Sequence, residues 1–173
     1  MESFYLLALT APQHITIRIR SVRDSIFRET GAVSALAFDP LIPVAFYSSP
    51  PDKKHFTDIT TPAAHFQLLS PEIHGKGIYF RVNSEQIFDT LKCITAAEEQ
   101  PRHIIEPFSG FFLCESTDHK TRKPITEIAA SKIKTGNLAW TGITLQMTEV
   151  ICRGSQSWFN NLDWTIMWEI ILG

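Results

Sequence analysis

The residues of this chain best suited to proton transfer are its six histidines, because an imidazole changes charge close to neutral pH. Two of them begin an H-x-T pattern, His14-Ile-Thr16 and His119-Lys-Thr121. In a β-strand, residues i and i+2 point to the same face, so this pattern would present an imidazole and a hydroxyl side by side. The four residues are therefore candidate catalytic residues. A threonine-rich chain with six histidines also produces such matches by chance.

The elements expected around these matches do not suit them. His14 falls at the start of a predicted helix, where residues i and i+2 diverge by about 200° and cannot share a face. His119 ends the turn-like stretch 116–119, and Lys120 and Arg122 would make a poor buried strand face. The sequence therefore leaves this pair as an alternative rather than as the preferred site.

From the remaining histidines we expect neither a metal site nor a bound cofactor. None of them pairs with another histidine or a cysteine at metal-ligand spacing; they are His55, His65, His74 and His103. The stretch 74–77, His-Gly-Lys-Gly, could offer backbone N–H groups and Lys76 to a phosphate, but it is more typical of a hairpin turn. Tryptophans gather near the C-terminal end, where packing explains them better than base stacking: Trp140, Trp158, Trp164 and Trp168.

Length and composition predict one domain, residues 1–173, built from two small lobes. Apolar residues make up 44% and charged residues 20%, which is typical of a soluble protein with a core, and the net charge of -2 argues against a surface coated by nucleic acid. Three cysteines at wide spacing indicate reduced, mostly buried thiols and a cytoplasmic protein. We expect no signal peptide at residues 2–10 and no membrane span.

The first half of the chain predicts a strand, a helix and a second strand. Residues 4–9 form a short apolar run typical of a buried strand, and Thr10 with Gln13 fits a capping box. Ile15, Ile19, Val22 and Ile26 then recur at helical spacing up to a plausible stop at Gly31. Residues 32–47 are extended and apolar, with a break at 39–40, and 48–54 read as a loop.

The second half repeats this order. Residues 65–69 and 77–82 predict neighbouring strands, and Asn83 caps a helix that ends before Pro101. Residues 108–114 and 122–131 predict two further strands, and 139–151 with 163–172 predict a terminal hairpin around 154–157. The two copies of strand, helix and strand are therefore residues 4–47 and 78–131, which predicts an α+β fold of two pseudo-symmetric lobes with antiparallel sheets around a central cleft.

This order of elements resembles the two-histidine (2H) phosphoesterase superfamily, which includes cyclic phosphodiesterases and 2'-5' RNA ligase-like proteins. The resemblance covers nearly the whole chain: the opening at residues 4–47 and the ending at 124–172 both follow the family's order. It implies two α+β lobes, each of which supplies one H-x-T/S-x motif to a central cleft. In the family, the two histidines act as general base and general acid on a phosphodiester, and the hydroxyl residues hold the phosphate oxygens.

Carried over by position, the family's motifs fall on residues that lack most of its functional groups. The first motif falls on 41–44, with Leu41 at the histidine position and Pro43 at the hydroxyl position. The second falls on 124–127, with Pro124 at the histidine position and Thr126 keeping the hydroxyl. Neither leucine nor proline transfers a proton, and losing a general acid or base typically costs on the order of 10²–10⁴ in rate.

The resemblance therefore implies a divergent 2H protein that lacks the usual cyclic-phosphate hydrolysis and binds a nucleotide or RNA phosphate in its cleft. Two alternatives stay open. One is an active cyclic phosphodiesterase that uses His14, Thr16, His119 and Thr121. The other is a protein-interaction module, in which the cleft is filled and the aromatic C-terminal hairpin docks an unidentified protein partner.

Overall fold

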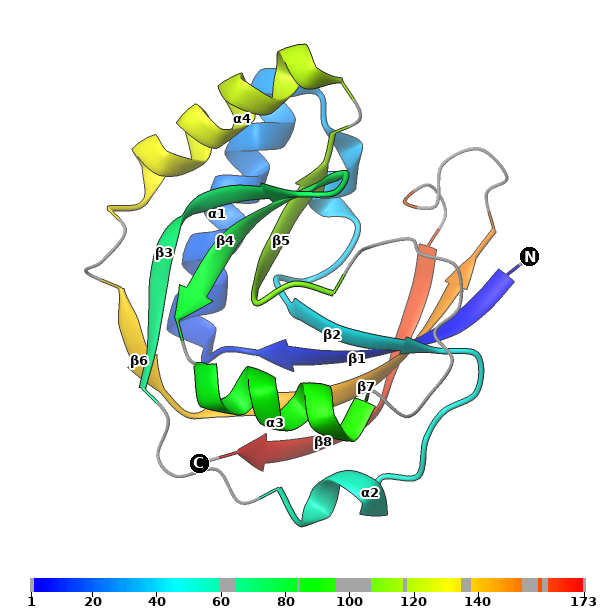
Figure 1. Ribbon diagram of the computed structural model, residues 1–173. Coiled ribbons are helices and arrows are strands. Elements are labelled where there is room, and N and C mark those ends of the chain that lie inside the picture. Colours follow the sequence, from blue (N-terminus) through cyan, green and yellow to red (C-terminus); the bar gives the residue numbers. More distant parts are fainter. Residues whose placement is uncertain are drawn as a thin grey trace.

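Two antiparallel four-stranded sheets form the framework of the protein in the computed structural model of Figure 1. The structure describes residues 2–59, 65–83, 85–95, 107–116, 118–134, 138–153, 159 and 162–172. The first sheet has the strand order β2-β1-β7-β8, with β1 at Glu2–Thr10, β2 at Ile42–Tyr47, β7 at Ile143–Cys152 and β8 at Leu162–Leu172. The second has the order β5-β4-β3-β6, with β3 at His65–His74, β4 at Gly77–Asn83, β5 at Gly110–Glu115 and β6 at Ala139–Thr141.

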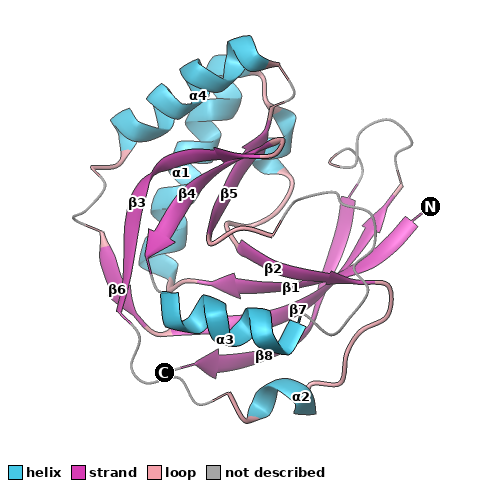
Figure 2. Ribbon diagram, in the orientation of Figure 1, coloured by secondary structure: helices cyan, strands magenta, loops and turns pink. Residues whose placement is uncertain are grey.

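Helices lie between and outside the sheets, so the fold is α+β, as the sequence predicts (Figure 2). They are α1 (Gln13–Thr30), the short 3₁₀ helix η1 (Val33–Leu36), α2 (Lys54–Thr57), α3 (Glu85–Thr95) and α4 (His119–Lys132). The long helix α1 packs against α4, and α3 packs beside β2. Among the described residues, none of the helices combines the length and the apolar character that crossing a membrane requires.

The first strand–helix–strand unit is formed by β1, α1 and β2. Its helix buries the predicted stripe of Ile15, Ile19, Val22 and Ile26, because residues three and four apart share one face of a helix. Gly31 ends α1 in the left-handed conformation (φ 73°), and its N–H donates to the carbonyl of Phe27 at 2.8 Å. The predicted stop is therefore confirmed.

The start of α1 differs from the predicted capping box. Thr10 belongs to β1, and Pro12 is the N-cap, without a side-chain capping bond. The carbonyl of Pro12 accepts the first helical N–H groups, from Ile15 at 2.9 Å and Thr16 at 3.1 Å. The fixed φ of proline favours the entry to the helix, so a hydroxyl cap is not needed there.

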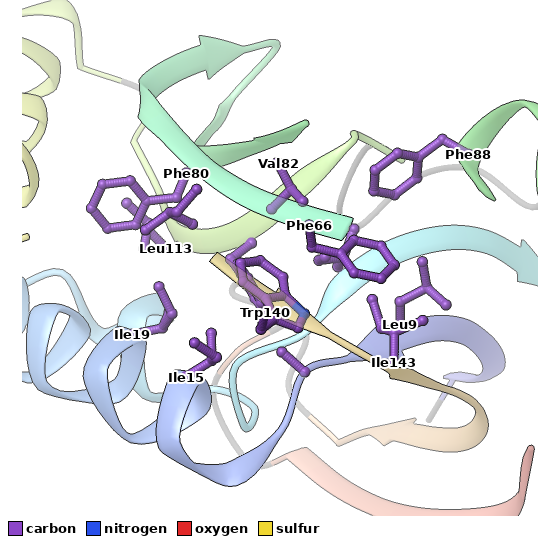
Figure 3. Packing of buried hydrophobic residues seen from close by; sticks show 14 of the residues in the cluster. Leu9, Ile15, Ile19, Phe66, Phe80, Val82, Phe88, Leu113, Trp140 and Ile143 are labelled. Atoms are coloured by element: carbon purple, nitrogen blue, oxygen red, sulfur yellow. The ribbon is translucent and has the colours of Figure 1, made fainter. Parts of the chain in front are cut away.

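The main hydrophobic core joins both sheets to α1 and α3 (Figure 3). Phe66 of β3 and Trp140 of β6 are cross-strand partners, and their rings stack with centroids 5.4 Å apart. Leu9 and Ile143 of the first sheet reach the same cluster. Large apolar side chains from elements far apart in the chain are therefore buried in one shared cluster.

A second, smaller apolar cluster lies where the sheets meet, and we call it the seam cluster. Its buried members come from both sheets and from the segment before β2: Phe4, Leu6, Ala8, Phe38, Leu41, Phe46, Tyr79, Phe112, Val150 and Cys152. Two backbone hydrogen bonds join the β5 region to the β2 region. The N–H of Phe112 donates to the carbonyl of Leu41, just before β2 (3.1 Å), and the N–H of Phe108, just before β5, donates to the carbonyl of Pro43 (3.3 Å). The edge strands of the two sheets are therefore joined directly.

The predicted strand at 122–131 is wrong, because this stretch forms most of helix α4. Asp118 caps the helix, with its carboxylate accepting from the N–H of Lys120 at 2.9 Å. Ile125 and Ala129 are buried and lie four residues apart, which is the spacing of a helix face. Pro124 lies inside the helix, in its second turn, and lacks the N–H that would otherwise bond to the carbonyl of Lys120.

The second strand–helix–strand unit is consequently β4, α3 and β5, and it ends at Glu115 rather than near Ser131. In both sheets the edge strand that closes the unit pairs with the strand that opens it, β2 with β1 and β5 with β4. The predicted 65–82 and C-terminal hairpins are confirmed as β3–β4 and β7–β8. The expected extended stretch 32–47 is interrupted by η1.

Several predictions fall on residues outside the described ranges. They concern the turn at 154–157, Trp158, His103 and the helix end before Pro101. Asn83 is the last residue of β4 and Ser84 is not described, so the predicted cap of α3 is not tested.

Candidate functional site

Leu41, the first motif position, is an apolar side chain in an apolar environment. It is only 4% exposed and belongs to the seam cluster together with Phe46 of the first sheet and Phe112 of the second. Pro43 lies two residues on, within β2, and its carbonyl accepts from the N–H of Phe108, just before β5. Position 41 therefore contributes to core packing and offers no proton-transfer group.

The structure does not bring the second motif positions to the same place. Pro124 is exposed, and Thr126 is half-buried on α4, with its hydroxyl donating to the carbonyl of Lys123 at 2.8 Å. Helix α4 packs against α1, β3 and β4, whereas Leu41 precedes β2 in the seam cluster. Thr126 therefore has a local partner in its own helix and does not face Leu41.

His14 and His119 lie at the first turns of two different helices, α1 and α4, and both side chains are exposed. The start of α4 follows β5, and Ser34 of η1, just beyond the end of α1, receives the N–H of Glu115 at 2.8 Å. His119 is thus near the end of α1 and His14 is at its beginning (Figure 1). Since α1 has 18 residues, about 27 Å long, the structure separates these two histidines.

The threonines of the same two matches are engaged locally. The hydroxyl of Thr16 donates to the carbonyl of Gln13 at 3.0 Å, and that of Thr121 donates to the carbonyl of Asp118 at 2.9 Å. Thr121 also lies 2.7 Å from the hydroxyl of Ser116. These bonds stabilise first helical turns rather than orient a substrate group.

The other histidines that the structure describes are His55, His65 and His74, on α2 and at the two ends of β3. His55 is on α2 and His65 begins β3, and both are exposed. His74 ends β3 and stacks on Phe108, with ring centroids 4.9 Å apart. Within the part of the chain that the structure describes, no three His, Cys, Asp or Glu side chains are grouped as metal ligands would be.

The stretch 74–77 is the turn between β3 and β4, as the hairpin interpretation predicts. His74 and Gly77 are paired across the turn, and Gly75 adopts φ 55°, a conformation that favours glycine. The carbonyl of Gly75 accepts from the guanidinium of Arg122 at 3.1 Å, which ties the turn to α4. The stretch is thus accounted for by the turn and its contact with α4.

A pocket of about 340 Å³ opens beside the junction of β2 and β5, and we call it the seam pocket. It is bounded by β2, the end of β3, β4, α3 and the segment that leads into β5. Its lining residues are Pro43, Val44, His74, Arg81, Phe88, Lys92, Pro107, Phe108 and Ser109. Pro43, to which the resemblance assigned the family's phosphate-binding hydroxyl position, therefore lines this pocket.

The basic side chains of the seam pocket are placed by the periodicity of their elements. Arg81 alternates along β4 with the buried Phe80 and Val82, so its guanidinium projects from the opposite face. Lys92 follows the buried Leu91 in the last turn of α3 and stays exposed. Together with His74, they give three basic side chains, and none of the described residues that line the pocket carries a carboxylate.

Backbone geometry around Gly110 places the hydroxyl and aromatic part of the lining. Gly110 pairs with Arg81, and a Cβ at this position would collide with the carbonyl of Phe80. The close approach allows the carbonyl of Ser109 to accept from the N–H of Val82 at 2.9 Å. The segment that carries Phe108 and Ser109 is thereby fixed along the edge of the pocket.

Glu72 partly balances the positive charge of Arg81. Its carboxylate lies 3.3 Å from the guanidinium, across the β3–β4 pair, and both side chains are about half exposed. An ion pair at this exposure contributes little and is screened by salt, so Arg81 can exchange it for a ligand phosphate.

Arg23 and Cys114 form a buried ionisable pair outside the pocket. Arg23 is 2% exposed and donates to the carbonyl of Phe38 at 2.6 Å, while its Nε and second terminal nitrogen have no partner among the described residues. Burial lowers the pKa of Arg23 to about 10, partly opposed by the Cys114 thiol and by Asp39. Burial raises the pKa of the Cys114 thiol to about 12, partly opposed by Arg23.

The raised pKa of Cys114 makes folding stability depend on pH in the alkaline range. Between pH 9 and about 10 the unfolded state loses the thiol proton and the folded state keeps it, so the free energy of unfolding falls by about 1 kcal/mol. Above about pH 10, the titration of Arg23 raises the free energy of unfolding, because the folded state loses the guanidinium proton there and the unfolded state keeps it. We expect the Cys114→Ala variant to lack the decrease between pH 9 and 10 in urea unfolding.

The exposed Cys93 provides the control, because Cys93→Ala removes a thiol without touching the core. Curves for Cys114→Ala and the wild type that run parallel from pH 8 to 10 would contradict this assignment. Cys114 and Cys152 are buried and Cys93 is exposed, so most of the cysteines are buried, as the sequence predicts.

Sequence reasoning missed most of the seam pocket. The side chains that it did not single out are Arg81, Phe88, Lys92, Phe108 and Ser109. They come from three separate segments, and no spacing in the sequence connects them. The one usable signal is Arg81, an exposed basic residue that interrupts the otherwise buried run 77–82 of β4.

Comparison with known proteins adds no relative: no family model matches this chain, and no curated protein that was compared with it is similar to it.

Proposed function

We propose that this chain is a divergent protein of the 2H phosphoesterase type that binds a nucleotide or RNA phosphate in the seam pocket without hydrolysing it. The arrangement of two strand–helix–strand units supports the proposal, because each unit contributes its closing strand to the junction of the sheets. The two-lobed, pseudo-symmetric organisation with a central cleft is part of this proposal. In this proposal, β5 is the closing strand of the second unit, the role that the sequence pattern predicted for residues 122–131.

The described residues at the junction include no pair of histidines, which supports the loss of hydrolysis. Leu41 falls at the position of the first family histidine and packs in the seam cluster. Among the described residues that line the seam pocket, His74 is the sole imidazole, and it stacks on Phe108. One imidazole can serve as acid or as base in one step, and a missing partner typically costs on the order of 10²–10⁴ in rate.

The observation that carries phosphate binding is the basic character of the described residues that line the seam pocket, none of which is acidic. Lys92 and Arg81 can pair with phosphate oxygens, and an arginine can do so through two parallel hydrogen bonds. The hydroxyl of Ser109 is a further donor. Phe88 and Phe108 offer aromatic faces to a base, which binds in a sequence-tolerant way by stacking.

A titration with adenosine 2',3'-cyclic phosphate tests both halves of this proposal. We expect saturable binding that weakens as salt is raised, because phosphate contacts between exposed charges are screened. We expect no product during prolonged incubation. Adenosine without phosphate is the matched control and should bind more weakly.

The protein-interaction alternative is favoured by one feature, the exposed apolar side chains of β8. Trp164, Ile166, Met167 and Ile171 are exposed on this strand, which stands at the end of the first sheet. Exposed apolar edge strands are sites of strand addition in other proteins. Nothing among the described residues shows what would cover this strand, so the alternative stays a prediction.

A further inference from the structure

A second cavity, which Leu41 helps to line, differs in its chemistry from the seam pocket. It has a volume of about 180 Å³ and opens between the flank of α1, the segment 38–41 and the face of β1, β7 and β8 that carries the seam cluster. We call it the threonine cavity, because Thr10, Thr16 and Thr148 line it. No step of the proposed phosphate binding uses it.

The floor of the threonine cavity is polar although it is buried. Gln146 and Thr148 stand two residues apart on β7 and therefore face the same side of the sheet. They are 5% and 1% exposed, and the amide nitrogen of Gln146 donates to the hydroxyl of Thr148 at 3.2 Å. Polar side chains are rarely buried in a strand unless their hydrogen-bonding groups are used.

Most of the hydrogen-bonding capacity of this pair is still open. A glutamine amide can donate two hydrogen bonds and accept at its oxygen, and a threonine hydroxyl can donate one. Within the described residues, the bond between Gln146 and Thr148 is their sole side-chain hydrogen bond. A donor and an acceptor therefore remain side by side on the cavity floor, an arrangement that complements an amide-type edge.

The walls of the cavity are apolar and suit one flat ring. Ile166 pairs with Thr148 across the β7–β8 ladder, and Trp164 pairs with Val150, so both side chains stand on the cavity side of β8. Leu41 and Phe38 face them from the opposite wall. An apolar cavity of about 150 Å³ in another protein accepts a benzene ring, so about 180 Å³ holds one six-membered ring with small substituents.

The charge at the cavity mouth cancels. Arg20 and Asp39 form an ion pair there, and both side chains are more than half exposed. They are the charged residues among the described side chains that line the cavity. The site therefore favours a neutral ligand, unlike the basic seam pocket.

We infer that the threonine cavity is a binding site for a neutral six-membered ring that carries an amide-type donor–acceptor edge, as a pyrimidine base does. The amide of Gln146 and the hydroxyl of Thr148 bind the edge of the ring. Trp164 and Leu41 contact its faces. The inference goes beyond phosphate binding and does not depend on it.

Ligand-observed NMR and calorimetry with uracil test this inference, because uracil has the ring and the edge but no phosphate. We expect saturable binding by the wild type and at least tenfold weaker binding by Gln146→Met, which keeps the length of the side chain and removes the amide. Thr165→Val is the matched control, since Thr165 is an exposed β8 residue outside the cavity, and it should bind as the wild type does.

Two outcomes would overturn the inference. One is the absence of saturable uracil binding up to the solubility limit, and the other is equal binding by the wild type and Gln146→Met. Should Gln146→Met fail to fold, Thr16→Leu fills the cavity from the half-exposed flank of α1 and should abolish binding. Uracil binding by a folded Thr16→Leu variant also contradicts the assignment.

Discussion

The Leu41→His variant is expected to be less stable than the wild type by about 2–4 kcal/mol and to show no phosphodiesterase activity. Leu41 is 4% exposed within an apolar cluster of both sheets. An imidazole there loses the packing of the leucine in the seam cluster, and its polar ring is largely removed from water, a cost of roughly 1–3 kcal/mol. Activity stays absent, because one added histidine in the seam cluster does not complete an acid–base pair.

Urea unfolding and an assay of cyclic-nucleotide hydrolysis measure the two effects. Leu41→Met is the matched control, since a swap that conserves volume in a core usually costs less than about 1.5 kcal/mol. A Leu41→His protein as stable as Leu41→Met would mean that position 41 faces solvent rather than the seam cluster. Gain of hydrolysis by this variant would show that a second acid–base group is already in place.

The Lys92→Glu variant is expected to bind adenosine 2',3'-cyclic phosphate at least tenfold more weakly than the wild type at low salt. Lys92 lines the seam pocket from the last turn of α3. The substitution replaces an attraction with a repulsion, and two charges about 5 Å apart near a surface interact by roughly 1–3 kcal/mol. Because the side chain is exposed, the effect should shrink as the salt concentration rises.

Lys132→Glu is the matched control for net charge and helix position. Lys132 ends α4, as Lys92 stands in the last turn of α3, and it pairs with Glu29 rather than lining the pocket. Both substitutions introduce an acid near a helix C-terminus, which costs about 0.3–1 kcal/mol of stability. Equal loss of binding in the two variants would indicate a general charge effect and would remove Lys92 from the site.

The parts of the fold that sequence patterns predicted are those in which local periodicity and burial agree. The stripe from Ile15 to Ile26 buries one face at the period of a helix, and the hairpins at 65–82 and 139–172 contain the buried apolar runs of β4 and β7. Helix α4 was misread because Ile125, Ile128 and Ala130 also fit a short strand. The decisive features were the Asp118 cap and the contact with α1, and the second of these is tertiary.

The candidate site was less accessible to sequence reasoning, for a physical reason. Pro43 was singled out and does line the seam pocket, but Pro124 and Thr126 were assigned to it through the misread strand. The basic residues of the pocket come from β4 and α3, and the pocket exists because β5 docks on β2. β5 carries the unremarkable sequence Gly-Phe-Phe-Leu-Cys-Glu, so nothing local marks it as half of a site.

The most direct test of the central claim is a ³¹P NMR experiment on the wild-type protein with adenosine 2',3'-cyclic phosphate, since one spectrum reports both binding and turnover. We predict that the cyclic-phosphate resonance shifts or broadens as protein is added, and that it stays the only nucleotide phosphorus signal over a day. Growth of a 2'- or 3'-monophosphate signal in proportion to protein concentration would contradict the loss of hydrolysis. A cyclic-phosphate resonance that excess protein leaves unchanged would contradict phosphate binding in the seam pocket.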